Sequence, residues 1–219
     1  GEILCHGTTI TAKTAKELPR YVSIVFQNAD DQIIASTVRD EVAFGPMNLK
    51  LPKDEVASRV EEALAYMNLS GYQDRPPHYL SGGEKKRVSI ADMIAMHPEI
   101  IIFDEPTASL DPQNAELLEG VLDRLSAGGK TILLSTHDVD LAYRWAQRLV
   151  VFHNGRIVAD GDPLQVFQDR DVLAQASLKR PVLLEVYEGL TARGLTGGGA
   201  WPRTVHELLA DCSSSDKDR

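Results

Sequence analysis

Two carboxylates stand at the end of an apolar run near the middle of the chain. Residues 100–103 read IIIF, and Asp104 and Glu105 follow directly. In a parallel sheet, ligands gather at the carboxyl ends of the strands. An aspartate at such an end can hold Mg²⁺, and a neighbouring glutamate can polarise a water molecule for attack on a γ-phosphate. The pair therefore predicts phosphoryl-transfer chemistry.

Two other apolar segments also finish in polar residues. Gln27 follows VSIVF, and His137 follows TILLST. If both segments are strands of the same parallel sheet, their ends meet Asp104 and Glu105 at one edge. Each residue alone is a weak signal, because strand ends are commonly polar. The prediction of a phosphate site depends on their occurring together.

Ser81-Gly82-Gly83 supplies a second anion-binding feature. Glycines let backbone N–H groups approach a phosphate closely, and a helix that begins there points its positive end at the anion. Ser81 can donate its hydroxyl. Ser81 is also a good N-cap, because Glu84 stands three residues later, as in a capping box. A helix is therefore predicted to begin at this motif.

The bulk properties narrow the class of protein. A chain of 219 residues, 43% of them hydrophobic, suffices for one large α/β domain or one domain with a small appendage. The net charge of -9 argues against a nucleic-acid-binding surface. Cys5 and Cys212 form no metal-ligand pair, which favours a reducing compartment. No apolar run approaches the roughly 18 residues that a membrane span needs.

Alternating strands and helices predict a doubly wound, largely parallel sheet. The expected strands are residues 2–5, 22–26, 99–104 and 131–135, and the expected helices are 53–67, 82–97, 116–125 and 139–147. The unbroken IIIF run predicts a strand covered on both faces. Residues 29–52 look loop-rich, and Asn154-Gly155 predicts a hairpin between 149–153 and 156–160. The tail from Leu164 looks helical, with a frayed end over the last eight residues.

These motifs, in this order, resemble the nucleotide-binding subunit of ATP-binding cassette (ABC) transporters over almost the whole chain. LSGGEKKR matches the family signature, IIIFDEP the Walker B strand, SLD the D-loop, STHD the switch histidine and VFQN the Q-loop. VFQNADDQIIASTVRDEVAFGPMNL is similar to the ATPases of energy-coupling-factor and cobalt/nickel uptake systems. The tail is similar to the small carboxyl-terminal region that many of these ATPases carry.

The resemblance implies a P-loop NTPase-like α/β fold. An ABC ATPase domain would span residues 1–163, with a helical signature subdomain over about 48–98 and a small helical extension over 164–219. ATP and Mg²⁺ are the implied ligands, shared between two subunits in a head-to-tail dimer. In the site of one subunit, the resemblance implies that Gln27 senses Mg²⁺ and the attacking water, Asp104 holds Mg²⁺, Glu105 is the general base and His137 contacts the γ-phosphate. For the opposite ATP, the residues implied to bind it are Ser81, Gly82, Gly83 and Glu84. Asp111 is implied to line the dimer interface.

The resemblance also implies partners. The chain would energise a membrane importer for cobalt or nickel ions or vitamins, from the cytoplasmic face of the membrane. A second ABC ATPase subunit, identical or different, would complete the dimer. An integral membrane subunit would dock near residues 28–48, with Phe44 and Met47 as candidate contacts. The alternative that these two side chains fill the core is equally open.

The sequence departs from the family pattern in one main respect. It contains no GxxxxGK[ST] loop, and Gly128-Gly129-Lys130 precedes a strand instead of joining a strand to a helix. We therefore expect an ABC ATPase without the part that carries this loop, and weak hydrolysis by the chain alone. The alternatives are a partner subunit that lacks the loop by nature, and an ABC-type DNA-maintenance head. Asp92, where small residues are common, is expected to face solvent or the coupling interface.

Overall fold

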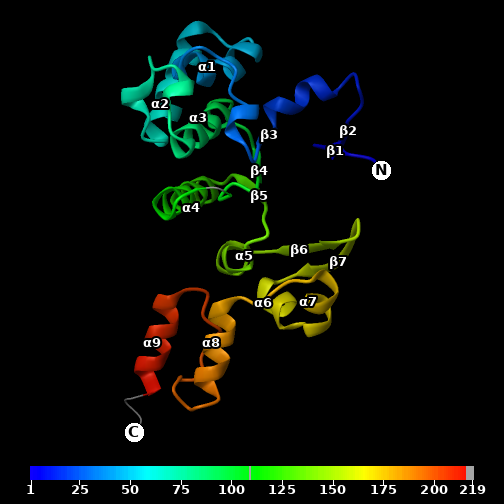
Figure 1. The fold of residues 1–219 in the computed structure, drawn as a ribbon. Helices are drawn as coiled ribbons and strands as arrows, with labels where there is room; N and C mark the ends of the chain where they lie inside the picture. The colour runs from blue at the N-terminus through cyan, green and yellow to red at the C-terminus, as the bar shows by residue number, and fades with distance from the viewer. Residues whose placement is uncertain (109, 216–219) are drawn as a thin grey trace. The chain divides into compact units, whose positions relative to one another are not determined.

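The computed structural model describes residues 1–108 and 110–215, and it divides the chain into two compact units, Gly1–Ser135 and Thr136–Arg219. Figure 1 shows the elements of each unit, which are described separately. The domain boundary expected between residues 163 and 164 stays a prediction.

A three-stranded parallel sheet forms the centre of the first unit. Its strands are β3 (Val22–Val25), β4 (Ile100–Asp104) and β5 (Thr131–Ser135), in the order β3-β4-β5. Ile100 stands opposite both Val22 and Thr131, so the three parallel strands are in register and begin at the same level. Their carboxyl ends therefore meet at one edge, as the sequence predicts. A short hairpin, β1 (Leu4–Cys5) with β2 (Thr8–Thr9), and the 3-10 turn η1 (Ala15–Arg20) precede β3.

The two faces of this sheet differ. Val25, Ile101 and Phe103 are buried. Helix α3 (Gly82–Ala95) packs against β3, and helix α4 (Pro112–Ala127) packs against β5. On the alternate positions, Ile24 and Phe26 are each 44% exposed and Leu133 is 50% exposed. In the IIIF strand itself, Ile101 and Phe103 are buried while Ile100 and Ile102 are only partly buried, so the expected full cover on both faces is met on one face and only in part on the other. A continuous apolar run has two buried faces only where a layer packs on each.

Three helices form a layer beside the sheet: α1 (Val38–Asn48), α2 (Lys53–Tyr66) and α3 (Gly82–Ala95). They pack on one another in pairs; the turn η2 (Ala29–Asp31) precedes α1, and η3 (Ser70–Tyr72) and η4 (Pro77–Tyr79) lie between α2 and α3. Helices α1 and α2 with these turns occupy the stretch between Gln27 and Leu80. A DNA-maintenance head would carry a long coiled coil there.

Helix α1 lies where the sequence predicts loop. The Thr37 side chain caps it by accepting the Asp40 N–H at 3.1 Å, and Val38 and Val42 are fully buried. Gly45 and Pro46 stand in its last turns, and the Cβ of a residue at 45 would lie 2.6 Å from Met96 Cγ. Close packing on α3 thus favours a helix where local propensity favours a turn.

Asp92 is also placed differently from the expectation. It lies in the middle of α3 and is only 5% exposed, so it faces neither solvent nor an open surface. Gln32 from the segment before α1 and Glu41 from α1 are its polar neighbours. The tight contact between α1 and α3 encloses its carboxylate.

Helix α4 (Pro112–Ala127) completes the first unit by burying one apolar stripe, Leu118, Val121, Leu122 and Leu125. These positions recur at helical spacing, so the helix expected over residues 116–125 is confirmed, with one extra turn at its start. Asp111 caps that first turn.

The second unit begins with α5 (Val139–Trp145) and the antiparallel hairpin of β6 (Leu149–His153) and β7 (Arg156–Gly161). Asn154 and Gly155 both have positive φ, 48° and 72°, as a two-residue hairpin turn requires. The predicted hairpin is confirmed. Helices α6 (Pro163–Gln168) and α7 (Arg170–Ala176) follow, and Tyr143, Phe167 and Leu173 form a core with Leu184.

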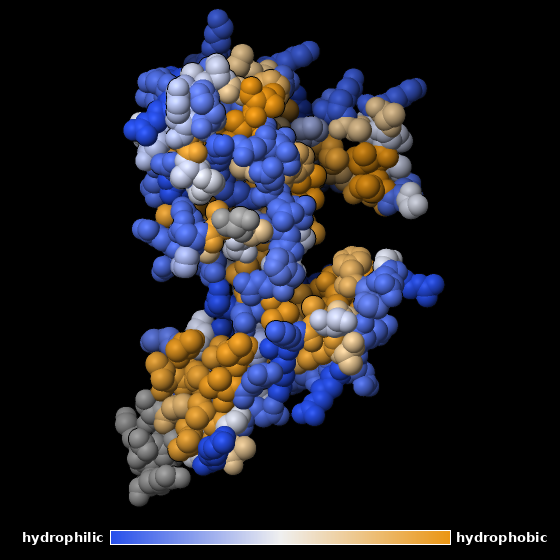
Figure 2. Space-filling view, in the orientation of Figure 1, coloured by the Kyte–Doolittle hydropathy of each residue, from blue (hydrophilic) through white to orange (hydrophobic). Residues whose placement is uncertain are grey.

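Two further helices, α8 (Val182–Thr191) and α9 (Val205–Ser215), end the described chain. Figure 2 shows apolar side chains along these helices, and Val182, Val186, Val205 and Leu209 are the exposed ones. Because α9 reaches Ser215, a frayed end does not begin at Cys212, and residues 216–219 lie outside the described residues. None of the described helices is long and apolar enough to cross a membrane.

Candidate functional site

The carboxyl edge of the three-stranded sheet brings three of the predicted residues together. Gln27 lies two residues beyond β3, Asp104 ends β4, and Glu105 follows it. Asp104 stands opposite Ser135, the last residue of β5. Gln27 and Asp104 are exposed, whereas Glu105 is partly buried. Adjacent parallel strands thus place an amide and two carboxylates at the sheet edge where ligands bind in this class of fold.

Ser135 holds the Asp104–Glu105 pair in position. Its hydroxyl donates to Asp104 Oδ1 at 2.5 Å, and its carbonyl oxygen accepts the Glu105 N–H at 3.1 Å. Sequence reasoning missed Ser135, because the register between β4 and β5 is a tertiary property. The serine in STHD was the available signal.

Glu105 adopts a left-handed backbone conformation, with φ of +41°. Such a conformation costs about 1–2 kcal/mol for a residue with a side chain. Strained residues of this kind cluster at functional sites. The turn takes the chain out of the strand immediately after Asp104, so the two neighbouring carboxylates need not point to opposite sheet faces.

A buried lysine lies beside this edge. Lys86 of α3 is 4% exposed, and its Nζ donates to the carbonyl oxygens of Phe26 and Gln27 at 2.6 and 3.1 Å. Burial lowers the pKa of Lys86 to about 8, and attraction to Asp104 opposes that shift. The sequence alone gave no sign of this role, because a lysine in LSGGEKKR is equally expected on an exposed helix surface.

Ser81 and Glu84 form the predicted capping box. The Ser81 N–H donates to Glu84 Oε2 at 2.7 Å, and the Glu84 N–H donates to Ser81 Oγ at 3.3 Å. The Ser81 N–H lowers the pKa of Glu84, which keeps this carboxylate ionised. Glu84 therefore has a structural role in the cap, and its contact with a nucleotide stays a prediction.

The two signature glycines have different surroundings. A Cβ on Gly82 would meet no atom within 4 Å, so the fold of this chain does not require a glycine there. A Cβ on Gly83 would lie 2.5 Å from Asn114 Cγ. Gly83 thus has a packing reason to be glycine, while Gly82 leaves backbone at the start of α3 open to a ligand.

Asp111 holds Asn114 against Gly83. Its two carboxylate oxygens accept the Asn114 backbone N–H at 2.9 Å and the Asn114 side-chain amide at 2.6 Å. The Asn114 N–H lowers the pKa of Asp111. The first member of the SLD motif, Ser109, lies outside the described residues.

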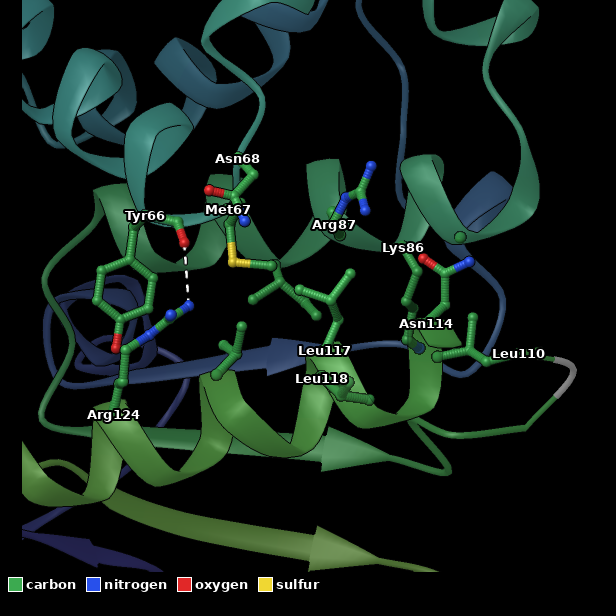
Figure 3. Close-up of a pocket in the computed structure, with 13 residues that line it drawn as sticks. Tyr66, Met67, Asn68, Lys86, Arg87, Leu110, Asn114, Leu117, Leu118 and Arg124 are labelled. Carbon is green, nitrogen blue, oxygen red and sulfur yellow. Dashed lines mark hydrogen bonds between the residues drawn. The ribbon is translucent and has the colours of Figure 1, made fainter. Parts of the chain in front are cut away.

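Figure 3 shows the crevice between α3 and α4 on which this contact borders. Apolar side chains including Met67, Leu117 and Leu118 line it, and Arg124 closes one end by donating to the Tyr66 carbonyl oxygen at 3.2 Å. The crevice therefore belongs to the packing between the helical layer and α4, and it contains none of the predicted catalytic side chains.

His137 belongs to the second unit, where it is exposed. The next residue, Asp138, caps α5 by accepting the N–H groups of Asp140 and Leu141, each at 3.0 Å. The local turn is thus defined, while the approach of His137 to the Asp104–Glu105 pair stays a prediction.

The residues at the sheet edge fit a hard cation. Carboxylate, hydroxyl and amide oxygens are supplied by Asp104, Ser135 and Gln27, and Mg²⁺ takes oxygen ligands. Among the described residues no group of three or more His, Cys, Asp or Glu could hold a metal by itself.

Comparison with known proteins identifies the family. The ABC transporter family model matches residues 1–108. A putative ABC transporter ATP-binding protein of Methanosarcina mazei is 46% identical over 95% of this chain and 47% of its own length. The energy-coupling factor transporter ATP-binding protein EcfA2 of Methanospirillum hungatei is 44% identical over 95% of this chain and 53% of its own length. The chain thus spans about half the length of these two curated relatives.

Another relative and two solved structures are covered more fully. The energy-coupling factor protein EcfA of Methanocaldococcus jannaschii is 46% identical over 97% of this chain and 79% of its own length. CbiO1 from Clostridium perfringens, part of the ABC transporter complex cbiONQ, matches with a TM-score of 0.70 and 34% identity over 87% of this chain and 71% of its own. The dimeric ATP-binding cassette MJ0796 bound to ADP and Pi matches with a TM-score of 0.65 and 26% identity over 74% and 73%. The chain has the mixed α/β fold of these proteins, and it belongs to the family of ABC transporter ATP-binding proteins.

Proposed function

We propose that this chain is part of an ATP-hydrolysing subunit that energises a membrane importer. The observation that carries the proposal is the sheet edge at which Asp104, Glu105 and Gln27 converge beside the capped signature helix. Family membership supports ATP as the ligand, since relatives are named as ATP-binding proteins and a similar solved structure holds ADP and Pi.

In this proposal Glu105 orients and deprotonates the attacking water. Asp104 and Gln27 would hold Mg²⁺, and the bound ion would supply positive charge to stabilise the phosphate groups. Ser135 fixes the Asp104 carboxylate, and His137 would contact the γ-phosphate. The hydrogen bonds from Ser135 to Asp104 and the Glu105 backbone support this proposal, because groups already held in position lower a barrier most.

The signature segment would serve a second ATPase subunit. Ser81 and Gly82 are exposed at the start of α3, where the helix presents its positive end. An ATP bound mainly by a second subunit could place its γ-phosphate there, with Gly83 and Asp111 at the same interface. Similarity to a dimeric cassette supports this arrangement. The proposal covers both an identical and a different second subunit.

The membrane partner is proposed to dock on α1 and the segment before it. Phe44 is 47% exposed, Met47 is 64% exposed and Ile34 is 69% exposed. The alternative that Phe44 and Met47 fill the core is therefore wrong. Apolar side chains in such a group favour contact with a protein partner. Replacing Phe44 with aspartate should weaken co-purification with the membrane subunit and leave the fold of the isolated chain unchanged.

The resemblance of VFQNADDQIIASTVRDEVAFGPMNL to the ATPases of energy-coupling-factor and cobalt/nickel uptake systems extends the proposal to vitamins or cobalt or nickel ions as the cargo. The chain would then work at the cytoplasmic face of the membrane. Uptake of labelled cobalt, nickel and vitamins by cells with and without this gene would identify the cargo.

Replacing Glu105 with glutamine tests the catalytic role. In the assembled transporter, Glu105→Gln should lower the hydrolysis rate at least about 100-fold while ATP binding persists, because the amide cannot take a proton. Glu99→Gln is the matched control, since Glu99 is exposed just before the same strand and pairs with His6. An unchanged hydrolysis rate in Glu105→Gln would remove Glu105 from catalysis.

A further inference from the structure

The buried ammonium of Lys86 is a charge that the proposed mechanism does not use. Lys86 lies in the second turn of α3 and is 4% exposed. Burying an ammonium group is costly unless it is paired or fully hydrogen bonded. Its partners are the backbone carbonyl oxygens of Phe26 and Gln27, at 2.6 and 3.1 Å from Nζ. The ammonium therefore joins the signature helix directly to the backbone at the end of β3.

Asp104 adds a second reason for the position of this charge. Its carboxylate attracts the Lys86 ammonium and raises the pKa of Lys86 against the lowering that burial causes. The ammonium therefore lies within electrostatic reach of Asp104 while it holds the Gln27 carbonyl oxygen. One side chain from α3 thus interacts with the ends of both β3 and β4.

The neighbouring lysine shows that this arrangement is specific. Lys85 precedes Lys86 on the same helix, but its Nζ pairs with the exposed Asp30 carboxylate at 2.7 Å. A pair of this kind at the surface contributes little to stability. The two adjacent lysines therefore have different partners: Lys85 pairs with an exposed carboxylate, whereas Lys86 donates to backbone carbonyl oxygens from a buried position.

We propose that Lys86 is a positioning residue that couples the signature helix to Gln27. Ser81, Gly82 and Gly83 form the start of the helix that carries Lys86, so a movement of that end shifts the ammonium. The ammonium then moves the Phe26–Gln27 backbone, which sets where the Gln27 side chain stands relative to Asp104. The inference rests on the proposed function, because it assigns Gln27 to the hydrolysis site.

Residue-resolved hydrogen exchange on the 219-residue chain tests the link without nucleotide. The Phe26 N–H donates to Gln32 Oε1 and the Gln32 N–H to the Ala29 carbonyl oxygen, so both amides can report on this segment. In Lys86→Met both should exchange about 10-fold faster, since hydrogen bonds to a charged group are lost. Lys86→Arg should restore most of the protection, and Lys85→Met should leave Phe26 protected.

Two exchange results would overturn the link. One is unchanged exchange at Phe26 and Gln32 in Lys86→Met. The other is an equal acceleration at every amide, including Leu64 in α2, which would mean that Lys86 only supports the fold. If Lys86→Met fails to fold by circular dichroism, Lys86→Gln takes its place, because it keeps an N–H donor on a shorter, uncharged side chain.

Hydrolysis by the assembled transporter tests the consequence for the reaction. Lys86→Met should lower kcat about 10-fold, with the KM for ATP within about twofold, because Gln27 is displaced while the nucleotide still binds. Lys86→Arg should recover the rate. A Lys86→Met rate equal to that of the wild type would overturn the positioning role. Absence of hydrolysis in the wild-type complex would instead contradict the proposed function, and the exchange experiment would still decide the link.

Discussion

Replacing Asp92 with asparagine should stabilise the first unit at high pH. Asp92 is 5% exposed where α3 packs on α1, and its buried Oδ1 accepts no well-formed hydrogen bond from the described residues. Burial, and then the nearby Glu41 charge, raise the pKa of Asp92 from 3.8 to about 7, against weak hydrogen bonds from Gln32 and the Gly45 backbone. The neighbouring polar contacts are Gln32 Nε2 with the Ser89 carbonyl oxygen and Glu41 with the Ile34 and Ala35 N–H groups, so the described residues place no cation against Asp92.

The sign follows from proton linkage. Because the folded-state pKa of Asp92 lies above its unfolded value, folding favours the protonated carboxyl group. The associated stability is fully present below about pH 4 and is lost as pH rises through about 7. A shift of about 3 pKa units corresponds to at most about 4 kcal/mol in the free energy of unfolding. Asparagine cannot ionise, so Asp92→Asn removes this loss at pH 8.

The assay must report on the first unit alone. Both tryptophans, Trp145 and Trp201, lie in the second unit, so their fluorescence follows that unit and serves as an internal reference. Exchange of α3 amides measures opening of the first unit at pH 5 to 9. Asp92→Asn should differ least from the wild type at pH 5, protect these amides increasingly more strongly as pH rises to about 7, and keep that advantage at pH 8.

Asp74→Asn is the matched control, since Asp74 is exposed. It should follow the wild type across the whole pH range. If wild type and Asp92→Asn show the same pH dependence, the buried carboxylate does not bind its proton more tightly in the folded state, and the reasoning fails.

Three further outcomes are expected. Gly83→Ala should cost at most about 1 kcal/mol, because displacing Asn114 from Asp111 is partly offset by the helix propensity that alanine gains; Gly82→Ala, whose Cβ would meet no described atom within 4 Å, should change the thermal unfolding temperature little. Ser81→Ala should lower stability by about 1 kcal/mol in urea unfolding, because it removes the hydroxyl that caps α3. The purified 219-residue chain, which contains no GxxxxGK[ST] motif, should hydrolyse ATP only weakly, and robust phosphate release in a coupled assay would contradict that expectation.

The sequence by itself determined the features that depend on near neighbours. The capping box of Ser81 and Glu84 joins residues three apart, and the Asn154-Gly155 turn joins two adjacent strands. Both were predictable because the interacting groups are close along the chain. The carboxyl ends carrying Gln27 and Asp104 were also predictable, since apolar strands alternating with helices imply a parallel sheet.

Only the tertiary structure decided the features that depend on distant residues. Ser135 reaches Asp104 through strand register, and Lys86 reaches Gln27 through the packing of α3 against β3. The same packing buries Asp92 and makes a helix of residues 38–48, which look like loop in isolation. Residue types and spacing do not specify such contacts, because burial and register arise only when separate elements meet. The chemistry of the candidate site is therefore visible in the sequence, whereas the groups that hold it in place are visible only in the fold.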